Sequence, residues 1–130
     1  MRKLTLTALI FSLLVLSSTS FADWKNVREN VDGDTLYVDF ERIRKHGGYV
    51  YWWELSDLLK PTEQGYLSDK SYNQGDCKLF RYKNLSFSSY KEPMGGGTGE
   101  FYNKPDKDWS YPPSNSNDEF ILKSICRYAN

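Results

Sequence analysis

The sequence predicts an α+β domain: an antiparallel β-sheet with a single C-terminal helix packed on one face and tied to the sheet by a disulfide. Short segments in which apolar and polar residues alternate are separated by Asp-Gly and Gly-Gly pairs, which is typical of consecutive antiparallel strands. After residue 115 the apolar residues instead recur at helical spacing. The chain has two cysteines, Cys77 in the strand-like region and Cys126 in the helical segment.

Residues 1–22 have the three parts of a secretory signal peptide. A basic start is followed by an almost entirely apolar run over residues 4–16, and small residues occupy positions 20 and 22, as signal peptidase requires. The apolar run is shorter than the ~20 residues of a membrane-spanning helix, which is the alternative interpretation. We expect cleavage after Ala22 and a single domain over residues 23–130, with no stable membrane anchor because no cysteine stands at the cleavage point for acylation.

The first half of this domain reads as three strands. A short strand is expected over residues 24–29, and a second over residues 36–40 after the turn signal Asp32-Gly33. The pair Gly47-Gly48 marks another turn. It precedes residues 49–56, an aromatic and β-branched stretch that is the most strand-like in the chain.

The second half continues the sheet and then loses its pattern. Residues 61–75 are polar and are expected to be a loop, whereas residues 76–90 alternate and predict a long strand. The glycines of residues 94–99 predict a turn, followed by a brief strand over residues 100–103. Residues 104–115 contain three prolines and are expected to be irregular.

The C-terminal segment predicts a helix of about three turns. Ser116 and Glu119 match a capping box, in which the serine accepts from the amide of residue 119 and the glutamate reaches back. Acidic residues stand at the start of the helix and basic residues near its end, as the helix dipole favours. The apolar stripe consists of Ile121, Leu122, Ile125, Cys126 and Ala129.

Export would place Cys77 and Cys126 in an oxidising compartment, where a disulfide between them is expected. A metal site or a reactive thiol is the alternative, but the chain has one histidine and therefore a poor set of metal ligands. Closing a loop of about 50 residues would stabilise the domain by ~4 kcal/mol on the chain-entropy model.

The disulfide also predicts which sheet face the helix covers. If the helix lies on the face toward which Cys77 points, strand alternation places Phe80 and Tyr82 on the opposite face. Trp52 and Trp53 are adjacent, so they point to opposite faces, and at least one of them is exposed unless a loop such as residues 61–75 covers it.

Aromatic residues make up 16% of the chain, with ten tyrosines and four tryptophans, which is more than one core of a sheet and a helix can hide. An exposed apolar patch commonly marks an interaction site. We therefore expect Trp52, Phe80 and Tyr82 to contact a partner, either a second copy in a homodimer or another protein.

Other function classes find little support. A net charge of zero disfavours nucleic-acid binding, which normally requires a basic face. His46 is the only histidine, and the sequence around it shows no serine or cysteine that it could activate as a nucleophile. The aspartates of residues 32–39 lack the ligand pattern of a calcium-binding loop. The glycines of residues 95–99 lack the lysine and helix of a phosphate-binding loop. We expect no catalytic residue, no metal and no cofactor, and therefore no enzyme.

Sparse motifs spread over residues 23–130 resemble one known family. They are Trp24, Tyr37-Val38-Asp39, Ile43, Val50-Tyr51-Trp52, Asp76-Cys77, a basic-aromatic strand, a glycine-rich turn, the segment from Trp109 to Ser114, and Ile125-Cys126. The chain is similar to the bacterial surface-adhesin protein E family. The resemblance implies an antiparallel sheet with a C-terminal helix joined to it by the disulfide, and members that can dimerise.

The resemblance also implies adhesion to host extracellular-matrix and serum proteins at the surface of Gram-negative bacteria. Two features depart from the family: no cysteine is present for acylation, and Pro112-Pro113-Ser114 replaces a Pro-Gly-Ser turn. The expected location is outside the cytoplasm of a Gram-negative bacterium, either in the periplasm or at the cell surface and secreted. The alternative function is a periplasmic inhibitor or immunity-type protein that blocks a hydrolase or a toxin, a role to which small disulfide-stapled sheet domains are also suited.

Overall fold

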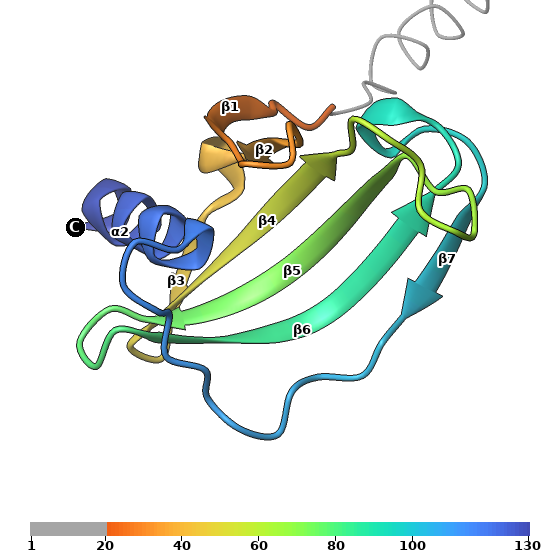
Figure 1. Cartoon of the computed structure of the whole chain (residues 1–130). Coiled ribbons are helices and arrows are strands. Elements are labelled where there is room, and N and C mark those ends of the chain that lie inside the picture. The colour runs from red at the N-terminus through yellow and green to blue at the C-terminus, as the bar shows by residue number, and fades with distance from the viewer. Residues whose placement is uncertain (1–20) are drawn as a thin grey trace, which may run out of the picture.

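A computed structural model describes residues 21–130, so the segment over residues 1–20 that we interpret as most of a signal peptide lies outside the described residues. The described chain forms one seven-stranded antiparallel sheet and one α-helix, α2 (Figure 1). The strands are β1 (Lys25–Glu29), β2 (Thr35–Val38), β3 (Arg44–His46), β4 (Tyr49–Asp57), β5 (Ser68–Asp76), β6 (Arg81–Tyr90) and β7 (Gly99–Tyr102). Two short 3-10 helices, η1 (Phe40–Arg42) and η2 (Pro93–Gly95), lie between strands.

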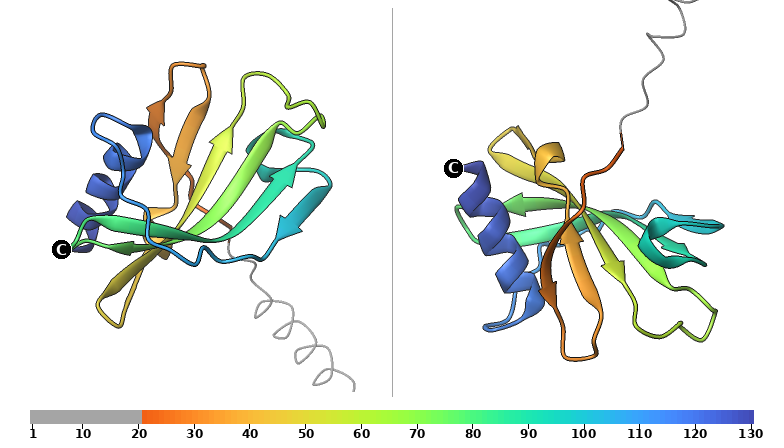
Figure 2. Two further views of the ribbon diagram at one scale, coloured as in Figure 1. Left: turned by 60° about the horizontal axis from the view of Figure 1, so that its bottom comes forward. Right: turned by 90° about the horizontal axis from the view of Figure 1, so that it is seen from above.

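The sheet order is β1-β2-β4-β5-β6-β7, and β3 pairs with the end of β4 that β2 leaves free. Neighbours along the sheet are joined by hairpins or short connections, so every pairing is antiparallel. The long strands β4, β5 and β6 form the centre of the sheet. Figure 2 shows that this sheet is strongly twisted and that α2 lies across one end of one face, leaving the end near β7 uncovered by the helix.

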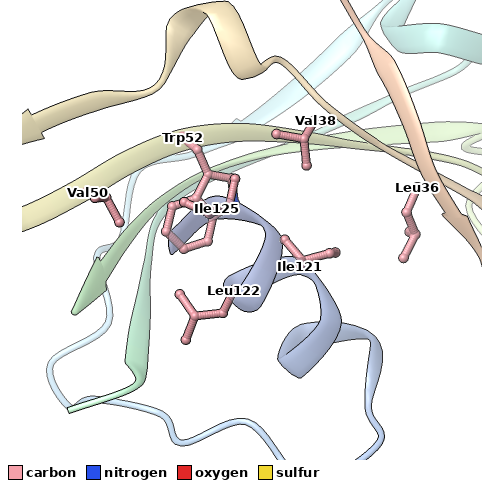
Figure 3. Packing of buried hydrophobic residues seen from close by; sticks show 7 residues of the cluster. All are labelled: Leu36, Val38, Val50, Trp52, Ile121, Leu122 and Ile125. Carbon is pink, nitrogen blue, oxygen red and sulfur yellow. The ribbon is translucent and has the colours of Figure 1, made fainter. Parts of the chain in front are cut away.

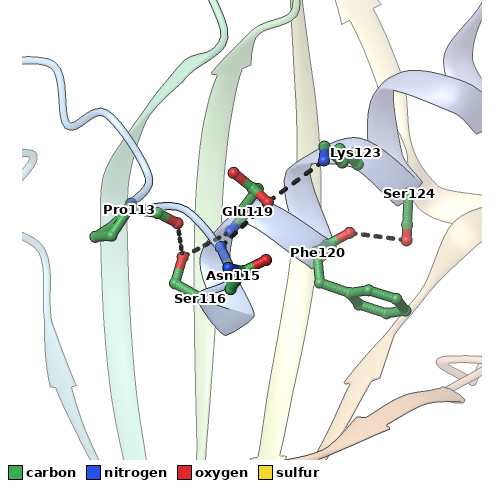
Figure 4. A network of polar contacts seen from close by, with 7 residues as sticks. All are labelled: Pro113, Asn115, Ser116, Glu119, Phe120, Lys123 and Ser124. Carbon is green, nitrogen blue, oxygen red and sulfur yellow. Dashed lines mark hydrogen bonds and ion pairs between the residues drawn. The ribbon is translucent and has the colours of Figure 1, made fainter.

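Helix α2 (Asn117–Ala129) begins where the capping signal predicts. The hydroxyl of Ser116 accepts from the amide of Glu119 at 3.1 Å, and the carboxylate of Glu119 accepts from the amide of Asn115 at 3.3 Å (Figure 4). The second bond goes to the residue before the cap because the amide of Ser116 itself bonds to the carbonyl of Pro113. The predicted cap is therefore confirmed, with its return bond shifted by one residue.

The core lies between α2 and the sheet, and the predicted helical stripe forms its helix side. It contains Leu36, Val38, Val50, Trp52, Ile121, Leu122 and Ile125 (Figure 3). Gly75 of β5 lies directly under the indole of Trp52, where an added Cβ would stand 2.7 Å from Cζ3. The absence of a side chain at residue 75 is what lets the indole of Trp52 approach β5 this closely.

The predicted disulfide is confirmed. Cys77 and Cys126 are bonded, with their Cα atoms 5.7 Å apart. Cys77 follows the end of β5 and Cys126 lies in the second half of α2, so the bond joins the helix to the β5–β6 turn. Packing of Ile125 and a covalent link at the next residue together hold α2 on this face.

Two expectations for the middle of the chain were wrong. Residues 61–75 were expected to be a loop, but Ser68–Asp76 form β5, a central strand with neighbours on both sides. Residues 76–90 were expected to be one strand, but a turn over residues 77–80, in which Phe80 has a φ of 53°, separates β5 from β6. The short strand β3 was also not expected, nor was the helix η1, which begins at Phe40, the last residue of the strand predicted over residues 36–40.

Candidate functional site

The missed turn reverses the predicted orientation of two candidate residues, Phe80 and Tyr82. Gly75 pairs with Tyr82 across β5 and β6, and with Val50 across β4 and β5, so Tyr82 shares the face of the buried Val50. Tyr82 and Phe80 pack against the core beneath α2, and the Tyr82 hydroxyl donates to the Asp118 carboxylate at 2.8 Å. Their predicted placement on the face opposite the helix is wrong.

Trp52 also lies on the helix side and is only 2% exposed. Its indole Nε1 donates to Oε1 of Glu54 at 2.7 Å, so both its ring and its polar atom are occupied within the domain. A role in partner binding stays a prediction for Trp52, Phe80 and Tyr82, but their placement does not favour it. Because side chains alternate along β4, the neighbouring Trp53 points to the opposite face.

We call the sheet face away from α2 the open face. It carries a row of half-buried aromatic side chains, here named the aromatic row, which consists of Tyr49, Tyr51, Trp53, Tyr72 and Trp109. Ring centroids are 5.3 Å apart for Tyr49 and Trp109, and 4.8 Å apart for Trp53 and Tyr72. Tyr51 and Tyr72 stack with centroids 6.2 Å apart, so Tyr72 contacts both Tyr51 and Trp53. The contacts are within the range of favourable aromatic pairs.

The alternation of residues along β4 is the sequence feature that predicts part of the aromatic row. Tyr49, Tyr51 and Trp53 stand at every second position, and an even spacing places them on one face. The prediction of a loop over residues 61–75 gave no reason to place Tyr72 in the row. In the structure, the register of β4 and β5 sets Tyr72 directly opposite Trp53. Trp109 lies in the irregular segment after β7, and only the tertiary fold brings it beside Tyr49.

Basic side chains accompany the aromatic row. The guanidinium of Arg81 lies 4.4 Å from the centre of the Trp109 ring, and the ammonium of Lys83 lies 4.8 Å from it. Arg81 is held by an ion pair with Asp76 at 2.9 Å. Arg44 is the register partner of Tyr51 on β3 and extends the basic border to the other side of the row. The open face therefore combines aromatic surface with the basic side chains of Lys83 and Arg44 and with the Arg81–Asp76 ion pair.

Burial raises the pKa of the Tyr72 hydroxyl, so this phenol stays protonated at neutral pH. The Tyr51 hydroxyl accepts from the side-chain amide of Gln74 at 3.1 Å and keeps its own proton for donation. The row therefore combines aromatic surface with hydrogen-bonding groups.

A cavity of about 210 Å³ opens on the same side of the sheet, between the chain at residues 22–24 and strands β5 to β7. Trp24, Trp53 and Phe101 supply apolar walls, while Asp39 and Lys70 supply charge. The cavity is contiguous with the aromatic row because Trp53 belongs to both.

A second cavity, of about 240 Å³, lies on the helix side where α2 ends its cover of the sheet. Glu54, Asp69 and Asp118 line it, and no lysine or arginine is among its lining residues. Desolvation raises the pKa of Glu54 to about 7 and that of Asp69 to about 6. The Glu54 carboxyl therefore exchanges its proton near neutral pH.

Nothing within residues 21–130 suggests a metal centre, since no three His, Cys, Asp or Glu side chains there are arranged to hold an ion. No helix in that part of the chain is long and apolar enough to cross a membrane.

The family model of surface-adhesin protein E matches residues 24–127. The chain belongs to the surface-adhesin protein E family. A search of curated protein sequences finds no match.

Solved structures of protein E from Haemophilus influenzae share the fold of this family member. Crystal form II aligns with a TM-score of 0.65 at 17% identity, covering 86% of this chain and 94% of that chain. A second structure of the H. influenzae protein aligns with a TM-score of 0.61 at 17% identity, covering 84% and 87%. Protein E from non-typeable H. influenzae aligns with a TM-score of 0.58 at 17% identity, covering 85% of this chain and 79% of that chain.

Membership of the surface-adhesin protein E family implies a non-enzymatic binding protein at an exported or surface location. The open face of this family member combines half-buried aromatic rings with basic side chains. Aromatic residues and arginine are enriched at protein interfaces.

Proposed function

We propose that this protein is an exported, non-enzymatic binding protein that engages a host or surface protein through its open face. The observation that carries the proposal is the aromatic row on the face that α2 leaves uncovered. Its five half-buried rings form two contacting groups, Tyr49 with Trp109, and Tyr72 with both Tyr51 and Trp53. Aromatic residues and arginine are enriched at protein interfaces and supply most of their binding energy. Membership of the adhesin family supports the same conclusion.

The chemistry of the open face limits the class of partner. Arg44, Arg81 and Lys83 border the row, so a complementary segment would carry carboxylates beside apolar side chains. Host matrix and serum proteins are the partner class that the family resemblance implies. Binding of such a partner weakens as ionic strength rises, because the border charges are partly exposed.

The location and assembly state follow from the same proposal. Adhesion requires that the protein reach the outside of a Gram-negative cell rather than remain in the periplasm. A homodimer would place a second copy on the open face and would compete with any other partner there. Cell fractionation with surface protease accessibility tests whether the protein reaches the cell surface. The mass of the purified protein in solution tests whether it is a homodimer.

The direct test is binding of the purified exported protein to immobilised matrix and serum proteins. Trp53→Ala removes a central ring of the aromatic row and is expected to weaken binding at least tenfold. Tyr128→Ala is the matched control, because Tyr128 is an exposed aromatic residue on α2, away from the open face. Binding of no matrix or serum component by the wild-type protein would refute the proposal. Co-purification of a bacterial hydrolase or toxin would favour an inhibitor or immunity-type role instead.

A further inference from the structure

The carboxylate of Asp39 is buried and only half satisfied. The residue follows β2, is 1% exposed, and lies beside the cavity of the open face. Its Oδ2 accepts from the backbone nitrogen of Asp23 at 3.2 Å and pairs with Nε of Arg42 at 3.3 Å. Its Oδ1 is enclosed and has no hydrogen-bond partner among residues 21–130, and it is the only buried side-chain polar atom there in that condition.

An orphaned oxygen on a buried carboxylate requires an explanation, because almost all buried polar side-chain atoms in native proteins are hydrogen-bonded. The cation already present, Arg42, reaches only Oδ2. A protein donor that satisfies Oδ1 has to reach it without displacing Arg42 from Oδ2. The backbone nitrogen of Asp23 already lies there, and in the uncleaved chain it carries a single hydrogen.

Asp23 is also the residue that signal cleavage would make the first of the mature chain. Residues 20–22 have the small-residue pattern of a cleavage site that ends at Ala22. Hydrolysis of the Ala22–Asp23 bond consumes one water molecule. The hydroxyl goes to the carboxyl group of Ala22, which leaves with the signal, and the freed amine of Asp23 takes up a proton to become an ammonium with three donors.

We propose that the Ala22–Asp23 bond is the export-processing site and that Asp39 is the receptor for the α-ammonium released there. The ammonium donates to Oδ2 from its present position and supplies Oδ1 with the donor it lacks. The pair is an N-terminal lock that cannot form in the precursor, because a peptide nitrogen has neither the charge nor the additional hydrogens.

The surroundings leave the ammonium free to make this pair. The side chain of Asp23 is engaged by Lys25 at 3.4 Å and does not compete for its own α-ammonium. Arg42 approaches Asp39 from η1. In the right-hand view of Figure 2, the chain that enters β1 passes beside η1 on its way into the sheet.

The lock has two structural consequences. It anchors the start of β1, which lies at the edge of the sheet and pairs with β2 alone among the strands of residues 21–130. It also defines the mature cavity of the open face, because Ala22 lines that cavity in the uncleaved chain and leaves with the signal, whereas Trp24 remains. Processing thus completes the fold at the edge of the candidate binding face, independently of what binds there.

The first measurement is intact mass and N-terminal sequencing of the exported protein, which should begin at Asp23. The decisive variant inserts one alanine between Ala22 and Asp23, so that the mature chain begins one residue early and its ammonium is displaced. We expect a fall in melting temperature of about 4–8 °C relative to the wild type, the size expected for loss of one favourable interaction in a domain of this length. Asp23→Ser is the matched control, since it alters the side chain but keeps the ammonium in place, and its melting temperature should be unchanged.

Asp39→Asn completes a double-mutant cycle. With Asp39→Asn in place, the inserted alanine should no longer change the melting temperature, because the receptor for the ammonium has been removed. The proposal is overturned if the mature chain begins elsewhere, if the insertion leaves the melting temperature unchanged, or if the two changes are additive. Should Asp39→Asn fail to fold, the insertion and its Asp23→Ser control decide the question alone.

Discussion

The indole of Trp52 donates a hydrogen bond to the carboxylate of Glu54, two residues along the same strand, at 2.7 Å. The bond places an ionisable group at the inner edge of the core, where β4 passes from beneath α2 into the acidic cavity. Desolvation, opposed in part by the indole, raises the pKa of Glu54 to about 7, and the charges of Asp118 and Asp69 act in the same direction. The ionised form of Glu54 is therefore disfavoured in the folded protein.

The first prediction concerns the pH dependence of stability. Unfolded Glu54 loses its proton near pH 4.5, whereas folded Glu54 keeps it until about pH 7. Between these values the folded state binds more protons, so the free energy of unfolding falls as pH rises. Glu54→Gln retains an acceptor for Trp52 and carries no charge. The unfolding free energy of Glu54→Gln should equal that of the wild type at pH 4 and exceed it at pH 8 by up to about 3 kcal/mol.

Urea denaturation between pH 4 and pH 8 measures this difference. Asp69 has a raised pKa of about 6 for the same reason, so a smaller decline should persist in Glu54→Gln. Glu63→Gln provides the control, because Glu63 is exposed in the loop between β4 and β5. Parallel stability curves for the wild type and Glu54→Gln would contradict the placement of Glu54.

The second prediction concerns the contact between Gly75 and Trp52. An added Cβ at residue 75 would lie 2.7 Å from Trp52, 3.0 Å from Val50 and 3.1 Å from Leu122, three atoms of a packed core. Gly75→Ala should therefore lower the free energy of unfolding by about 1–3 kcal/mol. Combining it with Trp52→Phe, which removes the clashing atom, should cost less than the sum of the two single changes. If the changes in unfolding free energy measured by urea denaturation are strictly additive, the Trp52 ring is not the atom group that the added Cβ at residue 75 contacts.

Local signals explain why α2 was predictable and β5 was not. The helix carries its own start signal at Ser116 and an apolar stripe of fixed spacing, both readable without knowing the rest of the fold. The sequence of β5 is polar almost throughout. It is a strand because β4 and β6 bond to both of its edges, and because its polar side chains line the acidic cavity rather than the core.

One missed turn then accounts for the misplaced site residues. A strand that runs unbroken from residue 76 would point Tyr82 away from the helix. The turn over residues 77–80 restarts the alternation and brings Tyr82 to Asp118. The aromatic character of the open face was predictable from β4 alone, but Tyr72 and Trp109 join it through pairing and tertiary contacts that no local pattern reveals.

The third prediction concerns the disulfide. Replacing both Cys77 and Cys126 by serine frees α2 from the β5–β6 turn while leaving Ile121, Leu122 and Ile125 to pack against the sheet. The bond spans 49 residues, so its loss should lower the free energy of unfolding by about 2–4 kcal/mol. The wild type with a reductant should behave like the double variant. A reductant that left the urea midpoint of the wild type unchanged would speak against a stabilising role for the bond.

The fourth prediction compares two serines of the same helix. Ser116 accepts from the amide of Glu119 at 3.1 Å and donates to the carbonyl of Pro113 at 2.6 Å, so Ser116→Ala leaves an amide of the first turn without its acceptor. The expected loss is about 1 kcal/mol of stability. Ser124 lies inside α2, and its hydroxyl donates to the carbonyl of Phe120, which is already engaged in the helix (Figure 4). Ser124→Ala should be neutral or slightly stabilising, because alanine favours the helix interior. Equal losses for the two variants in thermal denaturation would mean that Ser116 does not act as a cap, since only the first serine holds an amide that the helix itself cannot satisfy.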